Sequence, residues 1–383
     1  MSAPPESTAE RAAERAAIAV RELSREPRPA GSEGEARARA YCAARLRAAG
    51  FHVSEEPFEY SASVGRWGTP IGGLIAVTIV LSATAAARSG SPGVALVLLT
   101  LGAIALGAAA RALARTGVLT FPAQRRRGVN VVAVRRDDLQ LPAVPTVWLV
   151  AHLDSKSQPI PILARAAGIT LVGATWLAAI VAAGVQLVGG DDAATAWVWV
   201  LLAVVAAIGA VPVISTTVGE RSPGAVDNAS GVATILAAAE DSPGSQFGVC
   251  LTTAEELGLV GARAWVRNAA RGKPGVAINC DGVDDAGATT CMYSGRRPDT
   301  LVRAVLEASA RAGTAVRAHR LLPGVLTDGV ALADAGWQAV TLSRGRLRTL
   351  ARIHTPRDRA DDLTGSGVAE VARVIVEMLE TRP

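Results

Sequence analysis

The chain has 383 residues, a formal net charge of +5 and a mean hydropathy of +0.30. Half of the residues are hydrophobic and only 19% are charged, which excludes an intrinsically disordered protein. No dense basic tract with interleaved aromatic residues occurs, so the composition argues against nucleic-acid binding. The four cysteines are scattered without a Cys-X-X-Cys pair, which argues against a disulfide framework or a cysteine-based zinc ribbon.

The predicted elements begin with an amphipathic helix over residues 8–24. A second helix starts at the capping box Ser32–Glu35 and ends at Gly50. Five strands are expected after it, at residues 52–60, 128–134, 146–151, 247–253 and 276–280. Four further helices are expected, at residues 231–239, 259–270, 299–312 and 367–379. Strands 146–151 and 247–253 are almost wholly apolar, a pattern typical of central strands covered on both faces.

Four uncharged apolar runs interrupt this alternation, at residues 70–87, 92–110, 166–188 and 194–214. A membrane-spanning helix needs about 20 such residues; the last three runs reach that length and the first is marginal. Trp67, Trp197 and Trp199 at the ends of the runs fit an interfacial aromatic belt. Short connections join the runs in pairs. The sequence therefore predicts transmembrane hairpins over 70–110 and 166–214, and a single domain made of 8–66, 116–165 and 215–383.

The charges around the runs predict an orientation. The far side of the hairpins carries only Arg88 and the acidic pair Asp191-Asp192. Arginine is abundant on the domain side, at Arg66, Arg111, Arg115, Arg125, Arg126, Arg127, Arg165 and Arg221. By the positive-inside rule the domain is expected to be cytoplasmic. The first residues lack the apolar segment of a secretory signal, and the scattered cysteines agree with a reducing compartment.

Five polar segments follow predicted strands. They are AHLDS at 151–155, GAVDNASG at 224–231, TAEELG at 253–258, NCDG at 279–282 and IHTPRD at 353–358. In open α/β sheets, ligands bind at the carboxyl ends of strands. Imidazoles and carboxylates are zinc ligands, and two histidines with three acidic residues form two sites if one carboxylate bridges. Metals paired in this way lie about 3.5–4 Å apart and can share a hydroxide.

The pair Glu255-Glu256 suggests a division of roles. On an extended segment, neighbouring side chains point in opposite directions, so one glutamate can bind a metal while the other acts as the general base. Asp154, two residues after His152, can orient the imidazole. Each segment alone also fits a strand end, a helix cap or a surface turn, and it is the ordered set that indicates a metal site. His52 and His319 lack such a context and are expected to be ordinary surface residues.

The ordered set AHLDS, GAVDNASGVA, AEELGLVGARAW, NCDG and IHTPRD resembles the di-zinc aminopeptidases of clan MH, the family of bacterial leucyl aminopeptidases and aminopeptidase Y. Residues 27–53 also resemble the N-terminal part of that family. The resemblance implies an α/β fold with a mixed sheet between helix layers. It further implies a role for each ligand: His152, Asp227 and Asp281 would hold one zinc, Asp227, Glu256 and His354 would hold the other, and Glu255 would be the general base. Manganese and cobalt accept the same ligand types.

The activity implied is metallopeptidase hydrolysis that removes N-terminal residues, with a peptide or protein N-terminus as substrate and a lipid bilayer as the partner of the hairpins. One alternative is a glutaminyl-cyclase-like enzyme with one zinc, echoed by Lys156 directly after AHLDS. Another is a non-catalytic membrane binding or transport protein with a peptidase-like domain. The complete ligand set and the absence of charges within the apolar runs argue against the latter. The Ser-Asp-His common in the family reads Thr327-Asp328-Gly329 here, which leaves the substrate preference open.

Overall fold

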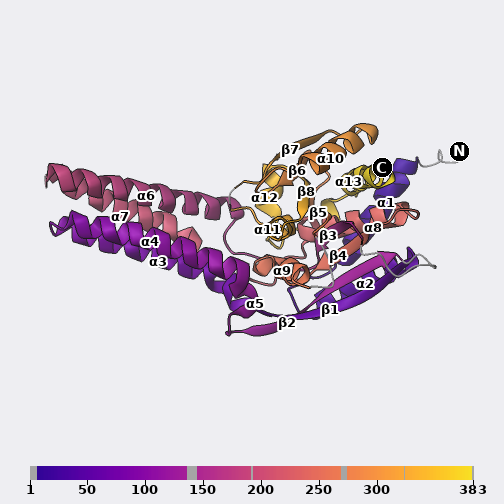
Figure 1. Cartoon of the computed structure of the whole chain (residues 1–383), viewed down its shortest axis with the longest axis horizontal. Helices are drawn as coiled ribbons and strands as arrows, with labels where there is room; N and C mark the ends of the chain where they lie inside the picture. Colours follow the sequence, from indigo (N-terminus) through magenta and orange to yellow (C-terminus); the bar gives the residue numbers. More distant parts are fainter. Residues whose placement is uncertain (1–6, 136–144, 191–192, 269–273, 323, 382–383) are drawn as a thin grey trace. The chain divides into compact units, whose positions relative to one another are not determined.

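The computed structural model describes residues 7–135, 145–190, 193–268, 274–322 and 324–381, and Figure 1 shows the order of the elements. The chain divides into two compact units. One comprises residues 1–60, 125–157 and 220–383, and the other comprises residues 61–124 and 158–219. The second unit thus consists of two insertions into the first.

The first unit is an α/β domain. Its elements in chain order are α1 (Thr8–Leu23), α2 (Glu33–Ala48), β1 (Phe51–Ser61), β2 (Arg125–Arg135), β3 (Val147–His152), η2 (Ala225–Ser230), α8 (Gly231–Asp241), β4 (Gly248–Thr252), η3 (Glu255–Leu257), α9 (Val260–Val266), β5 (Val276–Val283), β6 (Ala288–Tyr293), α10 (Asp299–Arg311), β7 (Val316–Arg320), α11 (Asp328–Asp334), β8 (Gln338–Gly345), α12 (Leu347–Arg352), η5 (Ala360–Asp362) and α13 (Ser366–Glu380).

An eight-stranded mixed sheet forms the centre of this unit, in the order β1-β2-β4-β3-β5-β8-β6-β7. Its middle strands β4, β3, β5 and β8 are parallel, whereas β2 pairs antiparallel with β4 and β6 antiparallel with β8. The expected mixed sheet flanked by helices is confirmed. Because the four middle strands run in one direction, their carboxyl ends meet at one edge of the sheet.

Strand β3 shows why the sheet is covered on both faces. All six of its residues are buried, and successive side chains point to opposite faces. Leu149 belongs to the larger core cluster, shared with α1, α2, α8, α10 and α13. Trp148 and Val150 belong to a second cluster, in which the Trp148 ring lies 4.9 Å from that of Trp265 of α9. The apolar run that predicted a central strand is therefore divided between two helix layers.

Three strands and two helices of this unit had no sequence prediction: β6, β7, β8, α11 and α12. The half-polar β7, VRAHR, lies at the edge of the sheet with two of its five residues partly buried and three exposed, so no apolar run marks it. The helix expected over 259–270 is shorter, because α9 ends at Val266, where Arg267 and Asn268 donate to carbonyls three residues back. Residues 269 and 270 lie outside the described part of the chain.

The second unit consists of the helices α3 (Ala62–Arg88), α4 (Pro92–Ala112), α6 (Ile162–Gly189) and α7 (Ala193–Ile214), with η1 (Leu113–Gly117) and α5 (Val118–Thr120) after α4. Four helices in the described residues are long and apolar enough to span a membrane. Exposed leucine, isoleucine and valine side chains cover much of their surface. Trp197 is exposed, but Trp199 is buried, contrary to the expected belt position, and its indole N–H donates to Gln186 Oε1 at 2.8 Å.

Candidate metal centre

The parallel strands bring four of the seven predicted site residues to one edge of the sheet. His152 is the last residue of β3, Asp281 lies near the end of β5, and Glu255 and Glu256 follow β4 in η3. His152 pairs with Thr252 in the β3–β4 register, so the glutamates begin three residues beyond the level of the imidazole. The carboxyl-end placement expected from the sequence is found for these residues.

Asp227 and His354 reach the same place without following a strand, which corrects the expectation that all five segments do. Asp227 lies in the irregular turn η2 before α8, and His354 follows α12 with a φ of +60°. The Asp358 carboxylate holds the Asp227 turn, because it accepts the N–H groups of Val226 and Asp227 at 2.9 and 3.1 Å. Burial raises the pKa of Asp358 to about 6.

The segment after Asp227 is fastened directly to β5. Asn228 Nδ2 donates to the Cys280 carbonyl at 2.9 Å, and Asn228 Oδ1 accepts from Gly282 N at 3.1 Å. Ser230 Oγ accepts from Val283 N at 2.8 Å. A Cβ on Gly231 would lie 2.1 Å from Asn228 Oδ1, so no larger residue fits there. The sequence Asp-Asn-Ala-Ser-Gly thus fixes Asp227 relative to Asp281.

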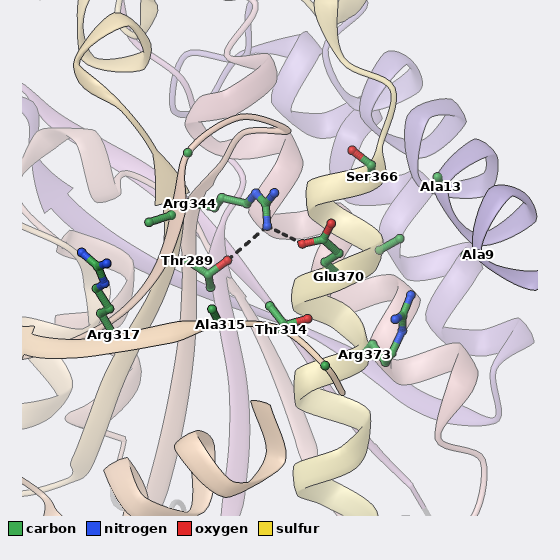
Figure 2. Close-up of a pocket in the computed structure, with 14 residues that line it drawn as sticks. Ala9, Ala13, Thr289, Thr314, Ala315, Arg317, Arg344, Ser366, Glu370 and Arg373 are labelled. Atoms are coloured by element: carbon green, nitrogen blue, oxygen red, sulfur yellow. Dashed lines mark hydrogen bonds and ion pairs between the residues drawn. The ribbon is translucent and has the colours of Figure 1, made fainter. Parts of the chain in front are cut away.

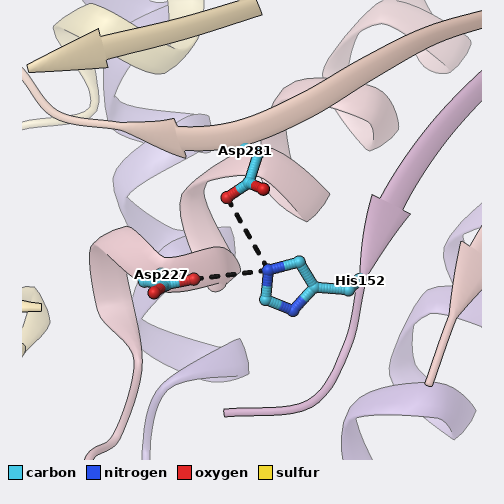
Figure 3. A group of neighbouring side chains, drawn as sticks. All are labelled: His152, Asp227 and Asp281. Atoms are coloured by element: carbon cyan, nitrogen blue, oxygen red, sulfur yellow. Dashed lines mark ion pairs between the residues drawn. The ribbon is translucent and has the colours of Figure 1, made fainter. Parts of the chain in front are cut away.

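The side chains form two groups that share Asp227. His152 Nε2 lies 3.3 Å from Asp227 Oδ1 and 3.7 Å from Asp281 Oδ1, as Figure 3 shows. His354 Nε2 lies 2.8 Å from the other oxygen of Asp227, Oδ2, and 3.3 Å from Glu256 Oε2. In each group the ligand atoms lie within 4.8 Å of one another. The two oxygens of one carboxylate therefore face two separate imidazoles, the arrangement that a bridging ligand requires.

Asp154 contacts both His152 and the Glu255-Glu256 pair. Its carbonyl is 3.0 Å from His152 Nδ1, and since a carbonyl can only accept, Nδ1 carries the proton and Nε2 faces the carboxylates. Its carboxylate lies farther from Nδ1, at 3.7 Å, and accepts the N–H groups of Glu255 and Glu256 at 3.0 and 3.2 Å. Asp154 thus orients the imidazole through its backbone, while its side chain fixes the glutamate pair.

Glu255 and Glu256 do not lie on an extended segment, so the expectation that they point apart by extended-chain alternation is wrong. Ala254 has a φ of +58° and the pair forms the short helical turn η3. The turn still separates the two carboxylates, because Glu255 Oε2 lies 3.9 Å from His152 Nε2 whereas Glu256 Oε2 faces His354. Burial, with the negative charges of Asp281 and Glu256, raises the pKa of Glu255 above its ordinary value despite the opposing effect of His152.

The donor set fits a pair of zinc ions. All ligand atoms are imidazole nitrogens or carboxylate oxygens, and all residues except the half-buried Asp281 are buried. Glu256 Oε1 is buried with no hydrogen-bond partner among the described residues, as expected for a metal ligand. Burial alone would raise the pKa of Asp227, but the imidazoles of His152 and His354 hold that pKa well below its usual range, so this carboxylate is ionised. His52 and His319 take no part in either group.

Three buried residues that the sequence reasoning did not assign support the site. The wholly buried Arg28 donates to the carbonyls of Leu23, Leu153 and Gly224 at 2.6, 2.8 and 3.0 Å, which ties the end of β3 to the Asp227 turn. Asp328 accepts a short hydrogen bond from the Thr252 hydroxyl, and burial raises its pKa to about 7. Asp358 belongs to the IHTPRD segment, but the sequence predicted no role for it. No local pattern distinguishes these residues, because most of their partners are distant in the chain.

The buried Glu35 predicts a pH dependence of stability. Its carboxylate accepts from Gly31 N at 2.6 Å instead of completing the expected capping box with Ser32, and burial raises its pKa from 4.5 to about 8. Between these values the unfolded chain loses the proton that the folded protein keeps, so stability falls as pH rises from 4.5 to 8. In Glu35→Gln the free energy of unfolding should no longer fall with pH in this range, a difference on the order of a few kcal/mol from the wild type. Thermal unfolding of both proteins from pH 5 to 9 tests this, and parallel pH curves would contradict it.

Comparison with known proteins gives a family match and several similar folds. The sequence model described as "Peptidase family M28" matches residues 130–379. No curated protein sequence matches the chain. Among solved structures, an aminopeptidase from Aneurinibacillus sp. strain AM-1 is similar with a TM-score of 0.55 at 16% identity, covering 96% of this chain and 92% of that one. A glutaminyl cyclase from Bacteroides thetaiotaomicron is similar with a TM-score of 0.57 at 14% identity, covering 97% of this chain and 98% of that one. The zinc aminopeptidase BSAP from Bacillus subtilis is similar with a TM-score of 0.53 at 14% identity, covering 97% of this chain and 96% of that one.

Proposed function

The chain belongs to peptidase family M28, and on that premise we propose that it is a membrane-anchored zinc aminopeptidase that removes N-terminal residues from peptides or proteins. The observation that carries the proposal is Asp227, whose two carboxylate oxygens face His152 and His354 at 3.3 and 2.8 Å. One zinc would be held by His152, Asp227 and Asp281, and the other by Asp227, Glu256 and His354.

Zinc bound in this way supplies Lewis-acid polarisation of the scissile carbonyl and stabilises the negative charge that develops on its oxygen. The protein supplies the proton transfers. Glu255 accepts a proton from the attacking water as the new carbon–oxygen bond forms, and returns it to the leaving amine as the carbon–nitrogen bond breaks. Asp154 keeps Glu255 in place through the N–H of that residue, at 3.0 Å.

The direct test is the reaction of the detergent-purified, full-length protein with a panel of aminoacyl-arylamides, with the zinc content measured on the same sample. Release of arylamine with two zinc ions per chain is expected. A zinc-loaded protein that is inactive on the whole panel, and on short peptides with free N-termini, would refute the aminopeptidase proposal.

Glutaminyl-cyclase-like activity is the second candidate, and Lys156 favours it. Its ammonium group lies 2.7 Å from Glu256 Oε2, which places a positive charge on one of the two metal groups and disfavours a second zinc there. A peptide with N-terminal glutamine distinguishes the activities. An aminopeptidase releases free glutamine, whereas a cyclase releases ammonia and leaves a blocked N-terminus.

Lys156 also predicts a measurable effect on metal affinity. A fixed positive charge beside Glu256 opposes a divalent cation at the Asp227–Glu256–His354 group. Lys156→Met should therefore tighten metal binding at this group by about 10-fold or more, the scale of effects from residues behind metal ligands. Titration against a chromogenic chelator measures it, with Lys156→Arg as the control that keeps the charge. Weaker binding in Lys156→Met would mean that the lysine supports the ligand instead.

Membrane anchoring rests on the four long apolar helices and the arginines that flank them. We propose that the hairpins span the cytoplasmic membrane and that the peptidase unit is cytoplasmic, as the positive-inside rule predicts. Cysteines introduced at Ser89, between α3 and α4, and at Ala193, the first residue of α7, should react with a membrane-impermeant thiol reagent on intact cells. A cysteine at Ser366 in the peptidase unit should not. The four native cysteines are buried and give little background, and the reverse labelling pattern would place the enzyme outside.

A further inference from the structure

A cavity of about 510 Å³ in the peptidase unit has no assigned role. Helices α1 and α13, the turns that precede β6 and β7, and Arg344 of β8 form its walls, and none of the metal-site residues lines it. Small residues keep it open: Ala13 on α1, Ala369 on α13, and the turn glycines Gly287 and Gly313. The volume falls within the range of sites that bind small molecules.

The charge of the walls is strongly one-sided. Three arginines line the cavity, Arg317, Arg344 and Arg373, against one acidic residue, Glu370. Glu370 is paired with Arg344, which also donates to the Asp285 carbonyl at 3.2 Å and to Thr289 Oγ1 at 3.4 Å. Neither Arg317 nor Arg373 forms an ion pair with any residue that the structure describes. The walls therefore carry two positive charges without counterions in the described part of the protein.

The charges of these groups suit a ligand with more than one negative group. In Figure 2, Arg317 and Arg373 lie on opposite sides of the Arg344–Glu370 pair. Ser366, Glu370 and Arg373 are spaced four and three residues apart on α13, which places them on one helix face. The lining threonines, Thr289 and Thr314, are buried and add hydroxyl groups that can donate hydrogen bonds. Arginine is the side chain best suited to carboxylate and phosphate oxygens.

We propose that this cavity is a binding site for a small organic dianion, a phosphate ester or a dicarboxylate, separate from the metal centre. Both classes share the feature that complements these walls: two negative charges on oxygen, matching the charges of the two exposed arginines, Arg317 and Arg373. Arg317 and Arg373 supply the positive charge that attracts the ligand, and Arg344, held by Glu370 and Thr289, lies between them.

The test is isothermal titration of the full-length protein in detergent with glycerol 3-phosphate and with succinate, each compared with chloride at matched ionic strength. Binding of at least one of the two dianions with a Kd on the order of 1 mM or below is expected. The double variant Arg317→Gln/Arg373→Gln should weaken it by about 100-fold, tenfold for each charge-assisted hydrogen bond that the substitutions remove. Which dianion binds more tightly identifies the ligand class.

The matched control is Arg21→Gln/Arg303→Gln, which removes two exposed arginines of the same unit that do not line the cavity. It loses the same net charge and should bind as the wild type does. Binding weakened equally in both double variants would mean a general charge effect, and binding retained in Arg317→Gln/Arg373→Gln would place the anion elsewhere, for example at the metal centre. Either result, or no binding of either dianion by the wild type, overturns the proposal.

Discussion

Glu255→Gln is expected to lower kcat by about 10²–10⁴-fold while the protein keeps its full complement of zinc. Glutamine has almost the same shape as glutamate, and the backbone N–H of residue 255 can still donate to Asp154 Oδ1 at 3.0 Å. The amide cannot accept a proton from the attacking water, however, so the loss falls on the chemical step. Steady-state kinetics with an aminoacyl-arylamide, together with elemental analysis of zinc, measure both quantities on one preparation.

Glu256→Gln is the matched control, because it makes the same change at the next residue. Glu256 Oε2 lies 3.3 Å from His354 Nε2 and belongs to a metal group, whereas Glu255 is outside both groups. The Glu256 variant should lose zinc, and added zinc should restore part of its activity. Near-wild-type turnover of Glu255→Gln, or zinc loss in that variant, would show that the two roles have been assigned to the wrong glutamates.

The middle of the sheet could be predicted from the sequence because its strands are buried on both faces. The runs at 146–151 and 247–253 are apolar throughout, and β3 and β4 occupy nearly those residues. The other end of the sheet could not be predicted. Strands β6, β7 and β8 mix apolar, hydroxylic and basic residues, and their stability depends on pairing with each other, as between Thr289 and Arg344. Such pairing is decided by neighbours some 55 residues apart, which a local pattern cannot show.

The candidate site divides in a similar way. His152, Glu256 and Asp281 were predictable because histidine and carboxylates seldom follow apolar strands without a reason. Asp227 and His354 follow no strand and were predictable only from the ordered set of segments and its resemblance, and the structure brings all five together. The residues that hold them were not predictable. Arg28 ties the site together through the carbonyls of Leu153 and Gly224, both more than 120 residues away. The contact between Lys156 and Glu256 spans 100 residues. Only the folded chain shows that Asp154 fixes the glutamate turn with its side chain and His152 with its backbone.

Asp227→Asn is expected to lower the zinc occupancy of both metal groups. Residues that hydrogen-bond to a metal ligand typically change metal affinity by about 10–100-fold, so loss of a direct ligand should lower the affinity by at least about 100-fold. Asn keeps the shape of the buried side chain but lacks the negative charge that both His152 and His354 face. His354→Ala should affect one group only, since His152, Asp227 and Asp281 remain. Metal analysis after dialysis against a zinc buffer should therefore give two equivalents for the wild type, about one for His354→Ala and close to none for Asp227→Asn. If saturated wild type holds a single zinc, or if Asp227→Asn retains as much metal as His354→Ala, the carboxylate does not bridge two ions and the glutaminyl-cyclase-like interpretation takes precedence.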